Sequence, residues 1–424
     1  MKRYCLLTAL VLFINVNAGR AQTDGYPLES DTKIGTTYTF QSKSLHGAWK
    51  VNVKVPKGYE QSNDKYPVVY VLHGDYYFSF ATGALQRMMD FGTMPASIIV
   101  GITNESNAYF AFGTKRADQF LDFIEEDVFS LIETAYRTHQ DRTVLGWHYT
   151  AGFAFHVLIN KPEMFENYIP ASPYLGGIDI NEIKFEGLSK IYNNNPNFKN
   201  SLYFGSMDNE RTVKSAALSL DSLLQLNNHE SLDWQFELLT PDYDKSNEVS
   251  VYRFWTTGLK TFYEEYKNEE LEISDLDEYK AKGGLTFVKE HYKKRATKFG
   301  GSSDITNIFS LLRLATRADN YKVFEELMNE LHGEYQDLNL NSVLSYAQFY
   351  LSNNKSEEAL AMYESINEFH PNLISVHDGF AQAYLSSGQK KEAITSYQFA
   401  IELAEAQDDD RLEALKTKLT KLDN

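Results

Sequence analysis

The sequence predicts an α/β fold, with a mainly parallel sheet and flanking helices, followed by an all-α region of helical repeats. Two observations support this prediction. Short apolar runs that end at or near glycine alternate with helix-like segments up to about residue 268, which is typical of a parallel sheet with helices on both faces. Beyond about residue 305 the pattern is helical, and two segments match at an offset of 34 residues.

Three strands are expected at Tyr66–Gly74, Ala96–Ile102 and Arg142–Gly146, because each is a short apolar run. Trp49–Pro56 alternates polar and apolar residues, like an antiparallel strand at the edge of a sheet. The segment Ala117–Tyr136 predicts a helix. Its apolar residues at helical spacing are Phe120, Phe123, Ile124, Phe129 and Ile132.

The helical region resembles tetratricopeptide repeats, in which helix pairs bury their apolar faces against one another. The matched pairs are Ala347 with Ala381, Tyr350 with Tyr384, Leu351 with Leu385, Ala359 with Ala393, and Tyr363 with Tyr397. Pro371 falls between the two units, where a helix must stop. Ile308–His332 is a candidate third hairpin, and residues 409–422 are a candidate capping helix. An ordinary helical bundle is the alternative.

The N-terminus has the pattern of an export signal. Lys2 and Arg3 precede the apolar run Cys5–Val16, and a small-residue cleavage site follows at Ala21, with another at Ala18. We therefore expect a periplasmic or secreted protein. Cys5, the only cysteine, lies before the apolar run rather than after it, so no lipid anchor is expected there. No later segment has the length and apolar character of a membrane span.

The domains are expected at 1–21 (signal peptide), 22–268 (α/β domain), 269–305 (connector with a helix or two) and 306–424 (helical repeats). The chain has a formal net charge of −17. This charge argues against nucleic-acid binding, which depends on lysine and arginine contacts to phosphate.

Several segments of the large domain resemble one family. They include "VKVPKGYEQSNDKYPVVYVLHGDYYF", "FLDFIEEDVFSLIETAYRT", "KPEMFENYIPASPYL" and "LYFGSMDNE". Together, from about Lys43 to Tyr266, they are similar to the esterase family of the α/β-hydrolase superfamily that includes esterase D and the periplasmic siderophore esterases. The resemblance implies the α/β-hydrolase fold and a Ser-His-Asp triad, in which the serine lies on a tight strand-to-helix turn. It implies no cofactor and no metal.

Two of the three triad positions depart from the family. In "RTVLGWHYTAGFAF", Gly146 matches the leading glycine of the turn and His148 stands at the serine. A shift of two residues would instead make Thr150 the nucleophile. The base position falls on Asn247 or Ser246, and no histidine occurs between Glu230 and Glu290.

The acid position is kept, with Asp208 as the first choice and Glu210 as the second. By the same resemblance, the ligand pocket is expected to involve His73, Gly74 and Asp75 in the loop after one strand, and Trp147 and Tyr149 beside the turn. A metal site built from His73, His148 and Asp208 is an alternative, since two histidines and a carboxylate are a legitimate ligand set.

Two functions follow from these residues. The first hypothesis is an exported esterase-family protein that has lost its triad and binds a ligand or a partner. The ligand would be a small ester, a glycan or a siderophore, and the repeats would bind a protein or peptide. The alternative is an active carboxylic-ester hydrolase with a non-standard nucleophile, His148 or Thr150. We favour binding, because the nucleophile and the base are absent together.

Overall fold

The computed structural model describes residues 33–45, 47–103, 112–175, 183, 186–195, 197–240, 247–331 and 339–423. The expected signal peptide at 1–21 lies outside these residues. Within the described ranges, no helix combines the length and the apolar character that a bilayer crossing needs.

One eight-stranded sheet forms the centre of the large domain, in the order β1-β2-β4-β3-β5-β6-β7-β8. The strands β3 to β8 pair in parallel, whereas β1 and β2 are antiparallel to their neighbours. Their bounds are β1 Thr36–Gln41, β2 Ala48–Lys54, β3 Tyr66–Leu72, β4 Ile98–Ile102, β5 Thr138–Trp147, β6 Asn167–Ala171, β7 Asn200–Met207 and β8 Leu232–Leu239. This confirms the predicted fold class.

One expectation needs correction. Trp49–Pro56 was expected at the edge of the sheet, and it does form the antiparallel strand β2. However, β1 pairs along its outer side, so β2 is the second strand from the edge. The pattern in Thr36–Gln41 was not recognised, because that strand is half-exposed and carries no continuous apolar run.

Helices cover both faces of the sheet. They are α1 Gly74–Asp90, α2 Lys115–Phe123, α3 Ser130–Ala135, α4 Tyr149–Asn160, α5 Glu186–Asn194, α6 Arg211–Leu226 and α7 Asn247–Phe262. Alternate residues of β3 point to opposite faces, so that Val69 and Val71 pack in one core with α1 and α7. Val68 and Tyr70 pack in the other core, with α2, α4 and α6.

The predicted helix Ala117–Tyr136 is present as α2, a π-helical turn at Ile124–Phe129, and α3. All five apolar residues predicted at its helical spacing are buried. The helical pattern is therefore confirmed, with one extra residue accommodated in the π turn.

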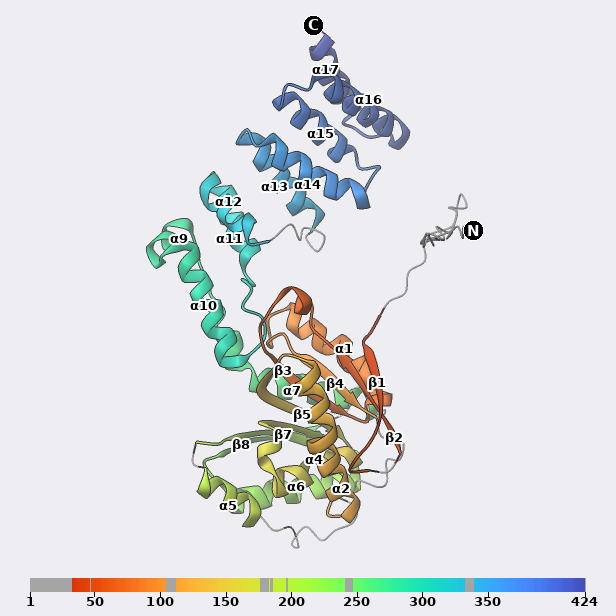
Figure 1. Ribbon diagram of the computed structural model, residues 1–424, viewed down its shortest axis with the longest axis vertical. Helices are drawn as coiled ribbons and strands as arrows, with labels where there is room; N and C mark the ends of the chain where they lie inside the picture. Colours follow the sequence, from red (N-terminus) through yellow and green to blue (C-terminus); the bar gives the residue numbers. More distant parts are fainter. Residues whose placement is uncertain are drawn as a thin grey trace, which may run out of the picture.

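The rest of the chain is helical. Its helices are α8 Glu264–Asn268, α9 Leu276–Lys282, α10 Gly284–Phe299, α11 Ile308–Arg317, α12 Tyr321–Asn329, α13 Leu340–Ser352, α14 Ser356–Phe369, α15 Ile374–Ser386, α16 Lys390–Gln407 and α17 Leu412–Asp423. Figure 1 shows α11 to α17 stacked in sequence order away from the sheet.

The 34-residue interval recurs in the structure, because α15 begins 34 residues after α13 and α16 begins 34 residues after α14. Tyr363 and Tyr397 occupy equivalent buried places. Gly379 of α15 lies so close to the Tyr363 ring that a Cβ atom at this position would overlap it. The helices therefore pack as successive pairs, and their assignment to tetratricopeptide repeats stays a prediction.

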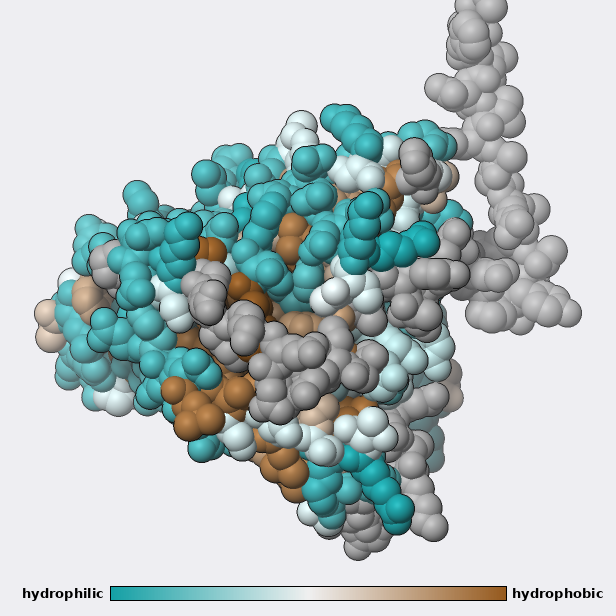
Figure 2. Space-filling view, turned by 90° about the horizontal axis from the view of Figure 1, so that it is seen from below, coloured by the Kyte–Doolittle hydropathy of each residue, from teal (hydrophilic) through white to brown (hydrophobic). Residues whose placement is uncertain are grey.

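One end of the molecule has a mainly polar surface. Figure 2 looks at the end of the molecule where the large domain lies, and this face is mostly hydrophilic with smaller hydrophobic areas. Large exposed apolar side chains of the large domain include Leu218 and Leu226 on α6. Such residues scattered singly are usual on soluble domains.

Candidate functional site

The candidate site lies at the carboxyl ends of β3 and β5. These two strands are neighbours, with Val71 opposite Leu145. From β3 the chain returns through α1 to β4 on one side, whereas from β5 it returns through α4 to β6 on the other. Such a reversal of direction leaves a crevice where ligands bind in open α/β sheets.

The turn from β5 into α4 is sharp, and His148 lies at its apex. His148 has φ 53° and ψ −111°, a combination that L-residues rarely adopt and that costs about 1–3 kcal/mol. Gly146 makes the turn sterically feasible, since a Cβ atom there would approach the Thr150 carbonyl oxygen to 2.6 Å. The His148 N–H donates to the Ala171 carbonyl (3.1 Å), which fixes the turn to β6.

Three aromatic rings surround the imidazole of His148. Tyr174 stacks on it, with centroids 5.0 Å apart and planes 5° apart. Tyr149 meets it edge-on at 4.7 Å, and the Trp147 ring lies 5.7 Å away. His148 is half-buried among these rings.

Loop 172–174 packs closely against α4, because residue 152 is a glycine. The Tyr174 N–H donates to the His148 carbonyl (3.0 Å). Gly152 lies directly beneath the Tyr174 carbonyl, and a Cβ atom there would overlap it. The glycine two residues after Thr150 therefore brings Tyr174 to the imidazole.

Thr150 does not have the position of a nucleophile. It lies in the first turn of α4 and is 4% exposed. Its hydroxyl donates to the Trp147 carbonyl and accepts from the Trp147 N–H, each at 2.9 Å. The strained backbone falls at His148, so the alternative with the turn shifted by two residues is not supported by this geometry.

The two candidate acids, Asp208 and Glu210, have different surroundings. Asp208 follows β7, is exposed and forms an ion pair with Lys214. Glu210 accepts hydrogen bonds from the Ser172 hydroxyl (2.6 Å) and from the Met207 N–H (3.2 Å). Glu210 is thus fixed by hydrogen bonds and Asp208 by an ion pair, and the choice of either as the acid stays a prediction.

Burial and the charge of Glu210 have opposite effects on the pKa of His148. Burial lowers the pKa of His148 below its usual value, and the nearby Glu210 carboxylate opposes this by raising it. Because burial is the larger effect, the imidazole is neutral at pH 7. A neutral imidazole can accept a proton or a hydrogen bond from a ligand.

The loop after β3 forms the other side of the crevice. His73 also has a positive φ (63°) and precedes α1. Gly74 packs on the backbone of Gly101, so closely that no side chain would fit. The His73 ring stacks near Tyr76 (5.7 Å) and meets Tyr77 edge-on (5.8 Å), with Asp75 at 3.7 Å from its Nε2.

Tyr77 connects the two sides of the site. Its ring lies 6.0 Å from Trp147 and 5.4 Å from Trp255 of α7. Trp255 donates its indole N–H to the Gly146 carbonyl (3.2 Å), so α7 also supports the turn. His73 thereby reaches the His148 region through an aromatic contact chain. Burial lowers the pKa of His73 as well.

The position expected for the base falls on Asn247 or Ser246, neither of which is a histidine. Asn247 is the first residue of α7, but its side chain and the whole of Ser246 lie outside the described residues. His229 lies before β8, where its ring is 4.9 Å from Tyr192 of α5. Within the part of the chain that the structure describes, no three His, Cys, Asp or Glu residues are placed to hold a metal. The alternative metal site of His73, His148 and Asp208 is therefore not formed.

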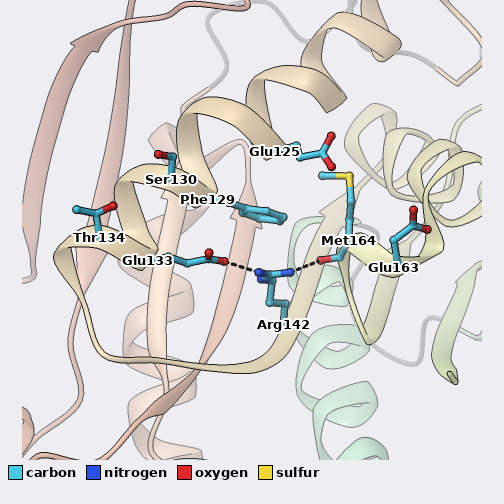
Figure 3. Close-up of a pocket in the computed structure, with 8 residues that line it drawn as sticks. All are labelled: Glu125, Phe129, Ser130, Glu133, Thr134, Arg142, Glu163 and Met164. Atoms are coloured by element: carbon cyan, nitrogen blue, oxygen red, sulfur yellow. Dashed lines mark hydrogen bonds and ion pairs between the residues drawn. The ribbon is translucent and has the colours of Figure 1, made fainter. Parts of the chain in front are cut away.

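A hollow of about 510 Å³ lies elsewhere in the large domain (Figure 3). Arg142 lies at its centre, bonded to Glu133 and to the Met164 carbonyl, with its guanidinium 4.5 Å from the centre of the Phe129 ring. Arg142 precedes Trp147 by five residues, roughly 17 Å along the strand. This hollow is therefore separate from the turn between β5 and α4, which we call the elbow.

Ser172, Tyr174 and Trp255 were missed by the sequence analysis. Ser172 is 1% exposed and has φ 49°, which no local pattern reveals. Ser172 and Tyr174 do lie in "KPEMFENYIPASPYL", the segment after the elbow helix, and this position was the available signal.

Comparison with known proteins agrees with the fold of the large domain. Residues 42–235 match the family model described as "Putative esterase". A solved structure described as an IroE-like serine hydrolase from Shewanella oneidensis covers 70% of this chain and 98% of its own, with a TM-score of 0.53 and 18% identity. The large domain has the α/β-hydrolase fold.

Two further similarities extend the comparison. Ferri-bacillibactin esterase BesA of Bacillus subtilis (strain 168) is 30% identical over 138 residues, which are 26% of this chain. The match spans 47% of that esterase, about half of its length. An uncharacterised protein from Capnocytophaga ochracea DSM 7271 covers 92% of this chain and 99% of its own, with a TM-score of 0.49 and 15% identity.

Proposed function

We propose that the large domain binds a small ligand at the elbow without hydrolysing it. The observation that carries this proposal is His148, which occupies the strained apex (φ 53°, ψ −111°) where a hydrolase of this family would hold its serine. The apex keeps its shape, but it presents an imidazole stacked on Tyr174 rather than a hydroxyl. A shaped crevice without the acyl-accepting oxygen is suited to binding.

Acyl transfer by the usual route needs a base beside the nucleophile. No histidine occurs between Glu230 and Glu290, so whatever the conformation of residues 241–246, that loop supplies none. His73 is engaged with Tyr76 and Tyr77 on the opposite side of the crevice. Two separate parts of the triad are therefore replaced, which supports a change of role rather than one altered residue.

The walls of the crevice suggest a ligand with flat rings. Trp147, Tyr149 and Tyr174 present aromatic faces around the imidazole. Aromatic pairs add about 0.5–1.5 kcal/mol beyond the burial of their area. One relative is named as an esterase of ferri-bacillibactin, so a siderophore is our leading candidate, ahead of a glycan or another small ester.

The helical region would bind a protein or peptide. A hollow between α13 and α15 is lined by polar groups, among them Asn341, Ser345, Gln348, Ser375, Asp378 and Gln382. Gln348 and Gln382 lie 34 residues apart, so they repeat at equivalent places. Amide side chains can donate to and accept from a peptide backbone, which supports an extended peptide as the partner.

We also propose that the protein acts after export.

The ligand proposal is tested by calorimetry of the full chain with ferri-bacillibactin, followed by chromatography of the recovered ligand. We expect binding with intact recovery, and weaker binding by the Tyr174→Ala variant. Absence of binding, or hydrolysed product from the wild type, would overturn the proposal.

For the repeats, peptide capture by the wild type is compared with that by a Gln348→Ala, Gln382→Ala double variant. Equal capture would argue against the polar hollow.

One observation favours the alternative of an active hydrolase. The elbow keeps a geometry that costs free energy, and the Glu210 carboxylate acts on the imidazole at its apex. Imidazole can itself be a nucleophile. In that case ester turnover would be lost in His148→Ala and reduced in Glu210→Gln, whereas the binding proposal expects no turnover to lose.

A further inference from the structure

We infer that residues 300–303 act as a latch, which fixes helices α9 to α12 to the amino end of the sheet. The chain leaves the α/β domain at α8, forms α9 and α10, and returns to the sheet at the latch before it enters α11. Relative motion is the usual expectation for two domains of one chain. The return contact removes that freedom here, whatever either region binds.

The latch is hydrogen-bonded to the segment directly before β3. The Ser303 N–H and hydroxyl both donate to Asp64 Oδ2, at 2.8 and 2.9 Å, and the hydroxyl lies 3.2 Å from Oδ1. The Gly301 N–H donates to the Lys65 carbonyl at 2.8 Å. Hydrogen bonds to a carboxylate are stronger than those between neutral groups, so Asp64 is the main attachment of the latch.

Two glycines allow the latch to pack closely on the strand ends. Gly300 and Gly301 have φ values of 72° and 88°, in the left-handed region that favours glycine. A Cβ atom at Gly300 would approach Pro67 to 2.8 Å and the His139 ring to 2.9 Å. One at Gly301 would approach the Ala96 backbone to 3.1 Å. The latch therefore contacts the amino ends of β3 and β5 and the segment before β4.

A buried arginine makes a second attachment. Arg295 of α10 is 3% exposed, and its guanidinium lies 3.7 Å from the centre of the Tyr266 ring of α8. It donates to the Tyr266 carbonyl from Nε (3.2 Å) and Nη2 (2.9 Å), and it pairs with Glu270 through Nη1. Tyr266 lies in the core that contains Val69 and Val71 of β3. Arg295 thus ties α10 to the core of the α/β domain.

Glu270 extends this attachment to the first helix after the latch. Its carboxylate accepts hydrogen bonds from the Tyr292 hydroxyl of α10 and from the Thr306 hydroxyl (2.6 Å), two residues before α11. The Leu271 carbonyl accepts from the side-chain amide of Asn307 (2.6 Å). Helices α9 and α10 also share one apolar core with α11 and α12. The start of the helical region is therefore fixed on both sides of the latch.

The latch and the elbow lie at opposite ends of the sheet. Because β3 and β5 are parallel, His148 follows the carboxyl end of β5, whereas the latch contacts the amino ends of both strands. The seven residues of β3 span about 20 Å. The latch therefore holds the helical region in a set position relative to the elbow and keeps its attachment away from the ligand crevice.

The test is a distance measurement by pulsed electron paramagnetic resonance on the full-length chain carrying Cys5→Ser. Spin labels are attached at two exposed positions through Asp90→Cys on α1 and Lys322→Cys on α12. We expect one narrow distance distribution when the latch is unchanged. A broad distribution in this protein would overturn the inference by itself, without any latch variant.

The latch is then disrupted in the labelled protein by the double change Asp64→Ala, Gly301→Ala, and we expect the distance distribution to broaden. Ser302→Ala is the matched control, because the Ser302 hydroxyl donates to Asp304 of the same segment (2.6 Å). A distribution that stays narrow in the double variant, or equal broadening in Ser302→Ala, would overturn the role of the latch. Circular dichroism verifies that each variant is folded. The measurement uses no ligand, so failure of the proposed function would be recognised separately.

Discussion

The imidazole of His148 and the phenol ring of Tyr174 lie nearly parallel, 5° apart in plane and 5.0 Å apart in centre. His148 comes from the turn after β5, whereas Tyr174 comes from the loop after β6, so this contact joins the carboxyl ends of β5 and β6. The contact also turns a position that could hold a nucleophile into part of an aromatic wall. Most of our predictions concern what this arrangement permits.

Restoring the serine alone should not restore catalysis. We expect His148→Ser to hydrolyse short-chain aryl esters no faster than His148→Ala, because no histidine between Glu230 and Glu290 can take the proton from the hydroxyl. The measurement is initial release of 4-nitrophenol by the two purified variants. A rate for His148→Ser more than about 100-fold above that for His148→Ala would mean that another base is present, since general-base catalysis contributes about 10²–10⁴-fold.

Adding a side chain at Gly152 should destabilise the protein and weaken ligand binding at the elbow. A Cβ atom there would overlap the Tyr174 carbonyl, so Gly152→Ala must move loop 172–174 away from α4. We expect a loss of about 1–3 kcal/mol in the free energy of unfolding, together with weaker ligand binding. Urea unfolding followed by circular dichroism measures the first effect.

Gly83→Ala is the matched control for Gly152→Ala. Gly83 also lies inside a helix, α1, but nothing is within 4 Å of a Cβ atom there. This change should stabilise the protein by up to about 1 kcal/mol, because alanine is the better helix former. If both variants behaved alike, the close approach of Tyr174 to α4 would be refuted.

Asp141, near the beginning of β5, should contribute to the pH dependence of the free energy of unfolding. Asp141 accepts hydrogen bonds from Asn167 (2.8 Å) and Tyr263 (3.1 Å), and burial raises the pKa of its carboxyl to about 6. The folded state therefore binds this proton more tightly than the unfolded chain, whose carboxyl has a pKa near 3.8. Stability from this group is highest at low pH and declines as the pH rises from about 4 to 6.

The Asp141→Asn variant removes that dependence. Its free energy of unfolding should improve relative to the wild type on going from pH 4.5 to pH 8, by about 2 kcal/mol, because pH 4.5 lies about 1.5 units below the folded pKa of about 6. Glu166, whose pKa burial raises to about 7, stays in both proteins. The exposed Asp233 on β8 supplies the control change Asp233→Asn. The same difference between variant and wild type at both pH values would count against a buried, protonated Asp141.

The sequence predicted the large domain well because its signals are local. A buried run such as Tyr66–Leu72 directly indicates a strand, and Gly146 directly indicates a tight turn. The place of His148 at the apex followed from the same pattern. The contact of His148 with Tyr174 did not, because Tyr174 reaches His148 through the pairing of β5 with β6. No spacing in the sequence records these contacts.

The choice between Asp208 and Glu210 illustrates this limit. Both follow β7 within three residues, and by sequence either can be the acid. The structure separates them through Lys214 on α6, which lies beside Asp208, and through Ser172, whose positive φ aims its hydroxyl at Glu210. A positive φ at a non-glycine residue depends on its surroundings and cannot be read from the residue type.

The most direct test of the central claim is kcat/KM for 4-nitrophenyl acetate, measured for the wild type and for His148→Ala. If the elbow is a binding site, the two proteins should give the same rate, far below the roughly 10⁴ M⁻¹s⁻¹ at the low end for enzymes. A wild-type value in the enzymatic range that disappears in His148→Ala would contradict the account and identify an active hydrolase with an imidazole nucleophile.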